Sequence, residues 1–170
     1  MIRQSLRLAI TLLACELAVS SSLADELKIH HAQGEMCGEV TPRSAILQSR
    51  LTANAGLVHG DVPGAVGVAC FEYSIDKDFG NSRRTSWMTA TPENDSIVKA
   101  KVSDLQPGTD YFYRLIYGPD GDNTTVGDTC RFKTLQGPTG TDNTSFVVVT
   151  GMNYVAFHIG KLKNGKRLTE

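Results

Sequence analysis

The sequence has 170 residues, a length that fits one domain, or two only if both are small. Charged residues make up 21% and hydrophobic residues 41%, a balance that is ordinary for a globular protein and argues against a wholly disordered chain. The 17 basic and 18 acidic residues give a net charge of −1, so no basic excess exists to attract nucleic acid or anionic lipid through bulk electrostatics.

Residues 1–24 have the order of a secretory signal peptide. Arg3 and Arg7 precede an apolar run over residues 8–15, and small residues close the segment before Asp25. The apolar run is too short to span a bilayer. We therefore predict an exported protein, in the periplasm, at the cell surface or secreted, with cleavage after Ala24.

The same segment also permits a lipoprotein interpretation. Leu12-Leu13-Ala14-Cys15 resembles a lipoprotein box in which Cys15 would become the lipidated first residue. Glu16 favours this alternative because it interrupts the apolar region, whereas Leu13 disfavours it because a small residue is usual there. A membrane partner is expected only if Cys15 is lipidated.

Alternation with a period of two predicts a strand-rich domain over residues 28–135. Strands are expected in five segments, residues 45–51, 66–75, 96–103, 110–118 and 129–134. The side chains expected to face the core are Ala45, Leu47, Ser49, Leu51, Ala69, Phe71, Tyr73, Ile75, Val98, Ala100, Val102, Tyr111, Tyr113, Leu115, Tyr117, Cys130 and Phe132. Gly- and Pro-containing turns separate the segments, and together they indicate an all-β sandwich of the fibronectin type III or immunoglobulin kind.

One turn is typical of such sandwiches. Leu105, Pro107, Gly108 and Thr109 lead into Tyr111 at the start of the next strand, which is where these folds place a tyrosine corner. The ring is expected in the core and the hydroxyl on a backbone partner across the turn.

The cysteines that follow the signal segment are Cys37, Cys70 and Cys130. Their number is odd and no C-x-x-C spacing occurs, which excludes zinc-ribbon and thioredoxin-like motifs. Cys70 is expected to point away from the core and Cys130 toward it, so the strands do not favour a bridge. We predict buried or half-buried small residues that form no site, with at least one thiol either free or paired outside this chain, while export still permits a bridge.

The tail differs from the sandwich in pattern. Residues 123–126 are polar and unpatterned, and residues 136–145 read as a linker. The apolar run over residues 146–149 does not alternate, which is typical of a strand covered on both faces. The alternative is a last edge strand of the sandwich.

Four segments in order resemble one family. Residues 38–50 (GEVTPRSAILQSR), residues 71–79, the tyrosine corner and residues 146–154 are similar to the N-terminal region of PhoD-like alkaline phosphatases (alkaline phosphatase D). The resemblance implies an exported metallophosphoesterase that uses Ca and Fe, in which a fibronectin-like (purple-acid-phosphatase-like) N-terminal domain precedes an α/β catalytic domain. It implies a signal peptide at 1–24, the sandwich at 28–135, a linker at 136–145 and the start of a truncated metallophosphoesterase domain at 146–170.

The resemblance does not carry over a catalytic, cofactor-binding or metal-binding residue. In that family the metal centre starts at a Ser-Cys-x-Asn-type turn, which corresponds to residues 150–153 here. Gly151 stands where the ligand Cys would be, and Asn153 matches the motif without an assigned role. The later G-D-N-x-Y motif has no counterpart, because Gly121-Asp122-Asn123 is followed by Thr124.

The histidines also lack metal-ligand spacing. His30 and His31 are adjacent, so on a strand they would face opposite ways, and we expect both in a solvated tail. His158 either faces an active site in a complete enzyme or lies in an exposed loop. The basic residues Lys161, Lys163, Lys166 and Arg167 are expected to be a solvated face rather than a phosphate clamp.

The sequence thus predicts the N-terminal fragment of an exported, metal-dependent PhoD-like phosphatase or phosphodiesterase. The fragment is expected to be inactive alone, to bind no cofactor and to be a monomer, with a phosphoester substrate only in the full-length enzyme. The alternative is a secreted or lipid-anchored fibronectin-like binding module without enzymatic activity.

Overall fold

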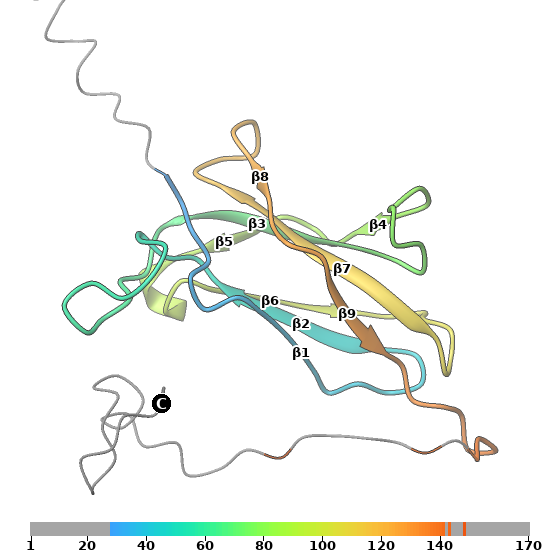
Figure 1. The fold of residues 1–170 in the computed structure, drawn as a ribbon. Helices are drawn as coiled ribbons and strands as arrows, with labels where there is room; N and C mark the ends of the chain where they lie inside the picture. Colours follow the sequence, from blue (N-terminus) through green and yellow to red (C-terminus); the bar gives the residue numbers. More distant parts are fainter. Residues whose placement is uncertain (1–27, 142, 144–147, 149–170) are drawn as a thin grey trace, which may run out of the picture.

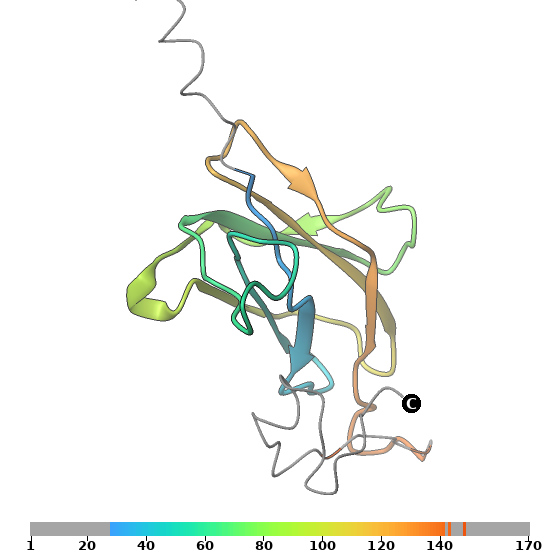
Figure 2. The same cartoon turned by 60° about the vertical axis from the view of Figure 1, so that its left-hand side comes forward.

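A computed structural model describes residues 28–141, 143 and 148. Two antiparallel sheets pack face to face (Figure 1), and a view from the side shows the same two layers (Figure 2). The three-stranded sheet has the order β1-β2-β6, with β1 at Glu35–Gly38, β2 at Ala45–Arg50 and β6 at Ile97–Val102.

The six-stranded sheet is built around two long central strands, β3 (Gly67–Ser74) and β7 (Asp110–Gly118). The short strands β4 (Arg83–Arg84) and β5 (Met88–Ala90) pair with β3, whereas β8 (Thr125–Val126) and β9 (Cys130–Lys133) pair with β7. A single 3-10 turn, η1 at Pro92–Asn94, joins β5 to β6. The result is the predicted fibronectin type III-like β-sandwich.

The core lies between the sheets and follows the predicted alternation. Leu47, Phe71 and Leu115 are fully buried there, and the tyrosines of β7 that were expected to face inward are buried as well. In β6 Val98, Ala100 and Val102 face the core while Lys99 and Lys101 are exposed. Burying these side chains supplies most of the driving force for folding, at about 25 cal/mol per Å² of apolar surface.

Ile75 is the exception among the predicted core residues. Its side chain is 53% exposed, because β3 ends at Ser74 and the chain turns away from the sheet at the next residues. The Ser74 hydroxyl accepts the backbone N–H of Asp76, and the Asp76 carboxylate accepts that of Asp78, which are the contacts of a polar turn. The prediction that Ile75 faces the core was therefore wrong.

The tyrosine corner is present. The backbone N–H of Gln106 donates a hydrogen bond of 2.9 Å to the hydroxyl of Tyr111, across the turn that the sequence indicated. The Tyr111 ring stacks on Phe132 with a centroid separation of 5.5 Å, which ties β7 to β9.

Four strands were not predicted, namely β1, β4, β5 and β8. They have two to four residues each, too few for a periodic pattern to be recognised. Residues 123–126, which the sequence presented as unpatterned, include β8. β4 and β5 form one edge strand interrupted by a bulge. Arg84 pairs with Glu72 and Met88 pairs with Ala69, so the three residues between Arg84 and Met88 lie opposite only two residues of β3.

The predicted burial of the three described cysteines is confirmed. Cys37, Cys70 and Cys130 are free; Cys70 is buried, and Cys37 and Cys130 are half-buried beside the core. Burial raises the pKa of Cys37 to about 11, so its thiol is protonated at neutral pH and is a poor nucleophile.

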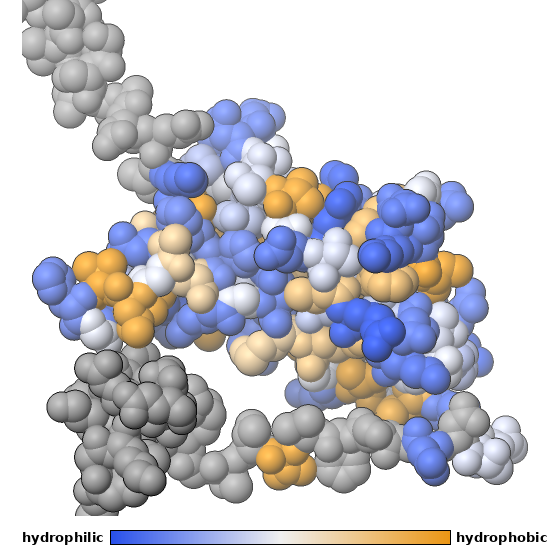
Figure 3. Space-filling model, in the orientation of Figure 1, coloured by the Kyte–Doolittle hydropathy of each residue, from blue (hydrophilic) through white to orange (hydrophobic). Residues whose placement is uncertain are grey.

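Apolar side chains do not gather into one large patch on the face shown in Figure 3. The described residues contain no helix long and apolar enough to cross a membrane. The predicted signal segment and, apart from Val148, the predicted strand at 146–149 lie outside the described residues, as do residues 150–170.

Candidate functional site

The most developed polar cluster surrounds Glu72, on the face of the six-stranded sheet that points away from the core. Because Phe71 and Tyr73 face the core, Glu72 between them faces outward, yet it is only 3% exposed. The loop between β3 and β4 covers this part of the sheet, and its Phe79 is buried.

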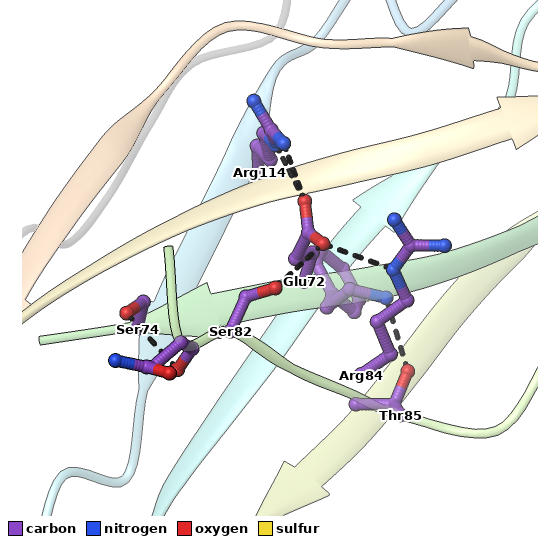
Figure 4. Close-up of polar contacts among 8 residues, drawn as sticks. Glu72, Ser74, Ser82, Arg84, Thr85 and Arg114 are labelled. Atoms are coloured by element: carbon purple, nitrogen blue, oxygen red, sulfur yellow. Dashed lines mark hydrogen bonds and ion pairs between the residues drawn. The ribbon is translucent and has the colours of Figure 1, made fainter. Parts of the chain in front are cut away.

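Both carboxylate oxygens of Glu72 are fully engaged (Figure 4). Oε1 accepts hydrogen bonds from Ser82 Oγ at 2.8 Å and from Arg84 Nε at 3.0 Å. Oε2 lies 2.7 Å from Nε and 2.6 Å from the second donor nitrogen, Nη2, of Arg114. The register places the three charged residues side by side, since Glu72 is the Cα partner of both Arg84 and Arg114.

The electrostatics of this cluster favour the ionised carboxylate. Burial alone would raise the pKa of Glu72, but hydrogen bonds from Ser82, Arg114 and Arg84 and the Arg114 charge outweigh it, so the pKa is lowered. The Arg114 guanidinium also lies 4.0 Å from the centroid of the Phe79 ring, a cation–π contact that secures the covering loop.

This arrangement is suited to holding structure rather than to reacting. A general base needs a free lone pair and a pKa high enough to take up a proton at working pH, whereas this carboxylate faces four donor atoms and has a lowered pKa. Its chemistry is that of a clamp, which fixes β4 and the loop before it onto the central strands.

A second cluster joins the N-terminal segment to the sandwich. His31 Nδ1 lies 2.6 Å from Glu35 Oε1, and the Glu35 side chain is only 3% exposed. The His31 ring packs against Tyr117 with centroids 4.7 Å apart, and Glu35 Oε2 lies 3.9 Å from Cys130 Sγ.

The prediction of a solvated tail at His30 and His31 was therefore wrong. His30 exchanges two backbone hydrogen bonds with Thr52, at 2.9 and 2.8 Å, and both histidines are half-buried. Ile29 is buried in the core just before them, which explains why the segment is held in place. His59 is exposed in the turn between Val58 and Asp61.

Within the described part of the chain, no three His, Cys, Asp or Glu side chains come together as metal ligands. Residues of this part therefore do not fit a Ca or Fe centre. Gly151, Asn153 and His158, the positions that the sequence connects with the family's metal motif, lie outside the described residues.

Fold and sequence together define the class: a fibronectin type III-like β-sandwich domain with a buried carboxylate clamp. The sequence model described as "PhoD-like phosphatase, N-terminal domain" matches residues 18–136. The chain belongs to this PhoD-like phosphatase family. No curated protein matches the chain.

The chain is similar to several solved structures. The structure of PhoD matches with a TM-score of 0.54 at 22% identity, covering 66% of this chain and 20% of the PhoD chain. The sensor domain of the anti-sigma factor RsgI4 of Pseudobacteroides cellulosolvens matches with a TM-score of 0.45 at 17% identity, covering 66% of this chain and 98% of that domain. A human fibronectin type III domain matches with a TM-score of 0.47 at 14% identity, covering 70% of this chain and 83% of that domain.

The sequence did not reveal the Glu72 clamp. The available signal was one acidic residue within the apolar run at 67–73, together with arginines in two other predicted or unassigned segments. Recognising the clamp requires the register between β3, β4 and β7, which brings Arg84 and Arg114 to either side of Glu72.

Proposed function

We propose that this chain forms the N-terminal, non-catalytic domain of an exported, metal-dependent PhoD-like phosphoesterase. The family match over residues 18–136 carries the proposal. The chain spans only 20% of the length of the PhoD structure it resembles, so most of that protein lies beyond the region compared. Residues 28–135 would be the sandwich, 136–145 the linker and 146–170 the start of the catalytic domain.

The chemistry of the described residues supports a structural role for this domain. A two-metal phosphoesterase needs several carboxylate and imidazole ligands converging on ions about 3.5–4 Å apart. Here the buried Glu72 carboxylate is already committed to two arginines, and the buried Glu35 carboxylate lies 2.6 Å from His31 Nδ1. The calcium and iron that the family resemblance implies would be held elsewhere in a complete enzyme.

Export is part of the proposal and is supported by the basic, apolar and small-residue order of residues 1–24. Cleavage after Ala24 would leave a short lead before Ile29, the first residue of the described chain that packs in the core. Lipidation of Cys15 would leave a longer spacer between the membrane and the same docked residue.

Phosphatase assays test the non-catalytic role. Residues 25–170 are purified and assayed with p-nitrophenyl phosphate and bis-p-nitrophenyl phosphate, with added calcium and ferric ions and with a chelator. We expect no hydrolysis above the chelated blank, while far-UV circular dichroism shows a folded β protein. Metal-dependent turnover by the folded chain would overturn the proposal.

A further inference from the structure

The free edge of β6 has hydrogen-bonding groups that the sandwich does not use. Among the described strands β6 pairs only with β2. The N–H of Leu51 donates to the carbonyl of Ser96 at 3.0 Å, which fixes the phase of this antiparallel ladder. The backbone N–H and C=O groups of every second residue, starting at Ser96, therefore point toward β2. Those of Ile97, Lys99 and Lys101 point away from it.

A groove follows this edge along its whole length. Two adjoining hollows, of about 480 and 340 Å³, lie between β6 and the interrupted edge strand formed by β4 and β5. They share Met88; the first reaches Ile97, Val98 and Lys99, and the second continues from Ala100 to Asp104.

The wall opposite β6 is partly apolar and well fixed. Met88 packs against the core from β5, which belongs to the opposite sheet and pairs with β3 rather than with β6. At the far end Arg83 lies 5.3 Å from the centroid of the Tyr73 ring, with Nη1 3.5 Å from the carbonyl oxygen of Ser103.

The charges around the groove have one predominant sign. Lys99, Lys101 and Arg83 are exposed along it, Arg84 is already paired with Glu72, and Asp104 is the acidic residue among the lining side chains. This concentration occurs in a chain whose acidic residues outnumber its basic ones, 18 to 17. The groove is therefore complementary to an acidic ligand.

We propose that the free edge of β6 binds an extended acidic peptide segment by strand addition. The N–H and C=O groups of Ile97, Lys99 and Lys101 would form the new ladder, which gives affinity without regard to sequence. Side chains of the added strand that face Met88 would be apolar, and those on the outer face beside Lys99 and Lys101 would be acidic. This interaction is independent of the proposed phosphatase role.

The same lysines disfavour a second copy of the chain as the occupant. Pairing β6 with its own copy would place the lysines of the two strands beside one another, and like charges across neighbouring strands are destabilising. Lysine on an edge strand is a common protection against such association. The edge thus discriminates between a basic and an acidic incoming strand.

Peptide binding tests the proposal on the 170-residue chain. The probes are fluorescein-labelled peptides of about eight residues, long enough to cover the strand, with alternating Val and Glu, with alternating Val and Lys, or with the Val/Glu composition scrambled. Fluorescence polarisation should show binding of the Val/Glu peptide at least about tenfold tighter than binding of the other two. The preference should weaken as salt is added.

Two variants locate the interaction. Lys99→Pro removes an N–H that faces the groove and leaves the β2–β6 hydrogen bonds intact, so the chain should fold and lose peptide binding. The double variant Lys99→Glu/Lys101→Glu keeps the backbone and should weaken binding about tenfold. Lys133→Glu, an exposed lysine on β9 of the other sheet, is the matched control and should bind as the wild type does.

Hydrogen exchange provides a readout at single residues. Adding the Val/Glu peptide should slow exchange of the Ile97, Lys99 and Lys101 amides. Equal binding of all three peptides, unchanged affinity in the double variant, or protection confined to other amides would overturn the proposal. Dimerisation through β6 would also overturn the proposal. If Lys99→Pro does not fold, the affinity of the double variant for the Val/Glu peptide is the deciding measurement.

Discussion

The outer faces of the two sheets differ in their exposure to solvent. In β2, of the three-stranded sheet, buried and half-exposed residues alternate along the strand, so its outer face remains in contact with water. In β3, of the six-stranded sheet, every residue except Val68 is buried. Both are antiparallel strands next to the same core, yet only the first shows the alternation expected of a half-buried strand.

The difference lies in what covers the outer face. No further sheet or helix of the described chain packs over β3; around Glu72 the cover is the loop between β3 and β4, secured through Phe79, Arg114 and Glu72. A buried charge is costly unless it is paired and hydrogen-bonded, and here each carboxylate oxygen has two donors. The clamp therefore lets a charged residue lie in the centre of a sheet face.

The largest expected effect comes from removing that charge. Glu72→Gln leaves two arginines beside a neutral amide and should lower the free energy of unfolding by about 3 kcal/mol. Gln48→Ala, at a half-exposed position on the outer face of β2, should change it by less than about 0.5 kcal/mol. Urea unfolding, followed by circular dichroism, measures both.

Equal effects of these two substitutions would show that the outer faces do not differ energetically. Glu72→Asp serves as a second test of the clamp, because it keeps the charge while shortening the reach to Arg84 and Arg114. We expect its stability to fall between those of the wild type and Glu72→Gln.

A smaller loss is expected when the cover is removed and the clamp is left in place. Phe79→Ala takes away a buried ring and its contact with the Arg114 guanidinium, and should lower the free energy of unfolding by about 2 kcal/mol. Val126→Ala is the control, because Val126 lies in β8 of the same sheet and is half exposed. If the two substitutions cost the same, the loop does not act as a cover.

Acid should weaken the clamp through its ionisation. The pKa of Glu72 is lower in the folded chain than its ordinary value of 4.5, so its contribution is fully present above that value and is lost as pH falls through the folded-state pKa. Subtracting the unfolding free energies of Glu72→Gln from those of the wild type should give a difference that is constant near neutral pH and shrinks below about pH 4.5. A difference that grows in acid would contradict this assignment.

Much of the sandwich could be predicted from the sequence because its long strands have one dry and one wet face. In residues 45–51 and 96–103 the alternation of residue types follows the buried and the solvent-facing sides of the strands, and the lysines of β6 mark its solvent-facing side. The tyrosine corner was also predictable, since Pro107, Gly108 and Tyr111 are close in sequence and their contact is local.

The errors arose where long-range contacts decide the environment. His31 looks like part of a polar lead until Glu35 and Tyr117 are placed beside it, and Ile75 looks like a core residue until β3 ends one residue earlier. The two- to four-residue edge strands owe their existence to a neighbouring strand with free hydrogen-bonding groups, and a periodic pattern cannot report this.

By itself the sequence determined the class of fold, the inward faces of the main strands, the tyrosine corner and the family to which the chain belongs. Each of these depends on residue spacing within one segment or on an ordered series of such segments. Only the tertiary structure decided that Glu72 is buried between Arg84 and Arg114, and that the edge of β6 is open along a basic groove. Both features depend on strand register and on which strand edges are left unpaired, because these bring together residues that are distant in the chain.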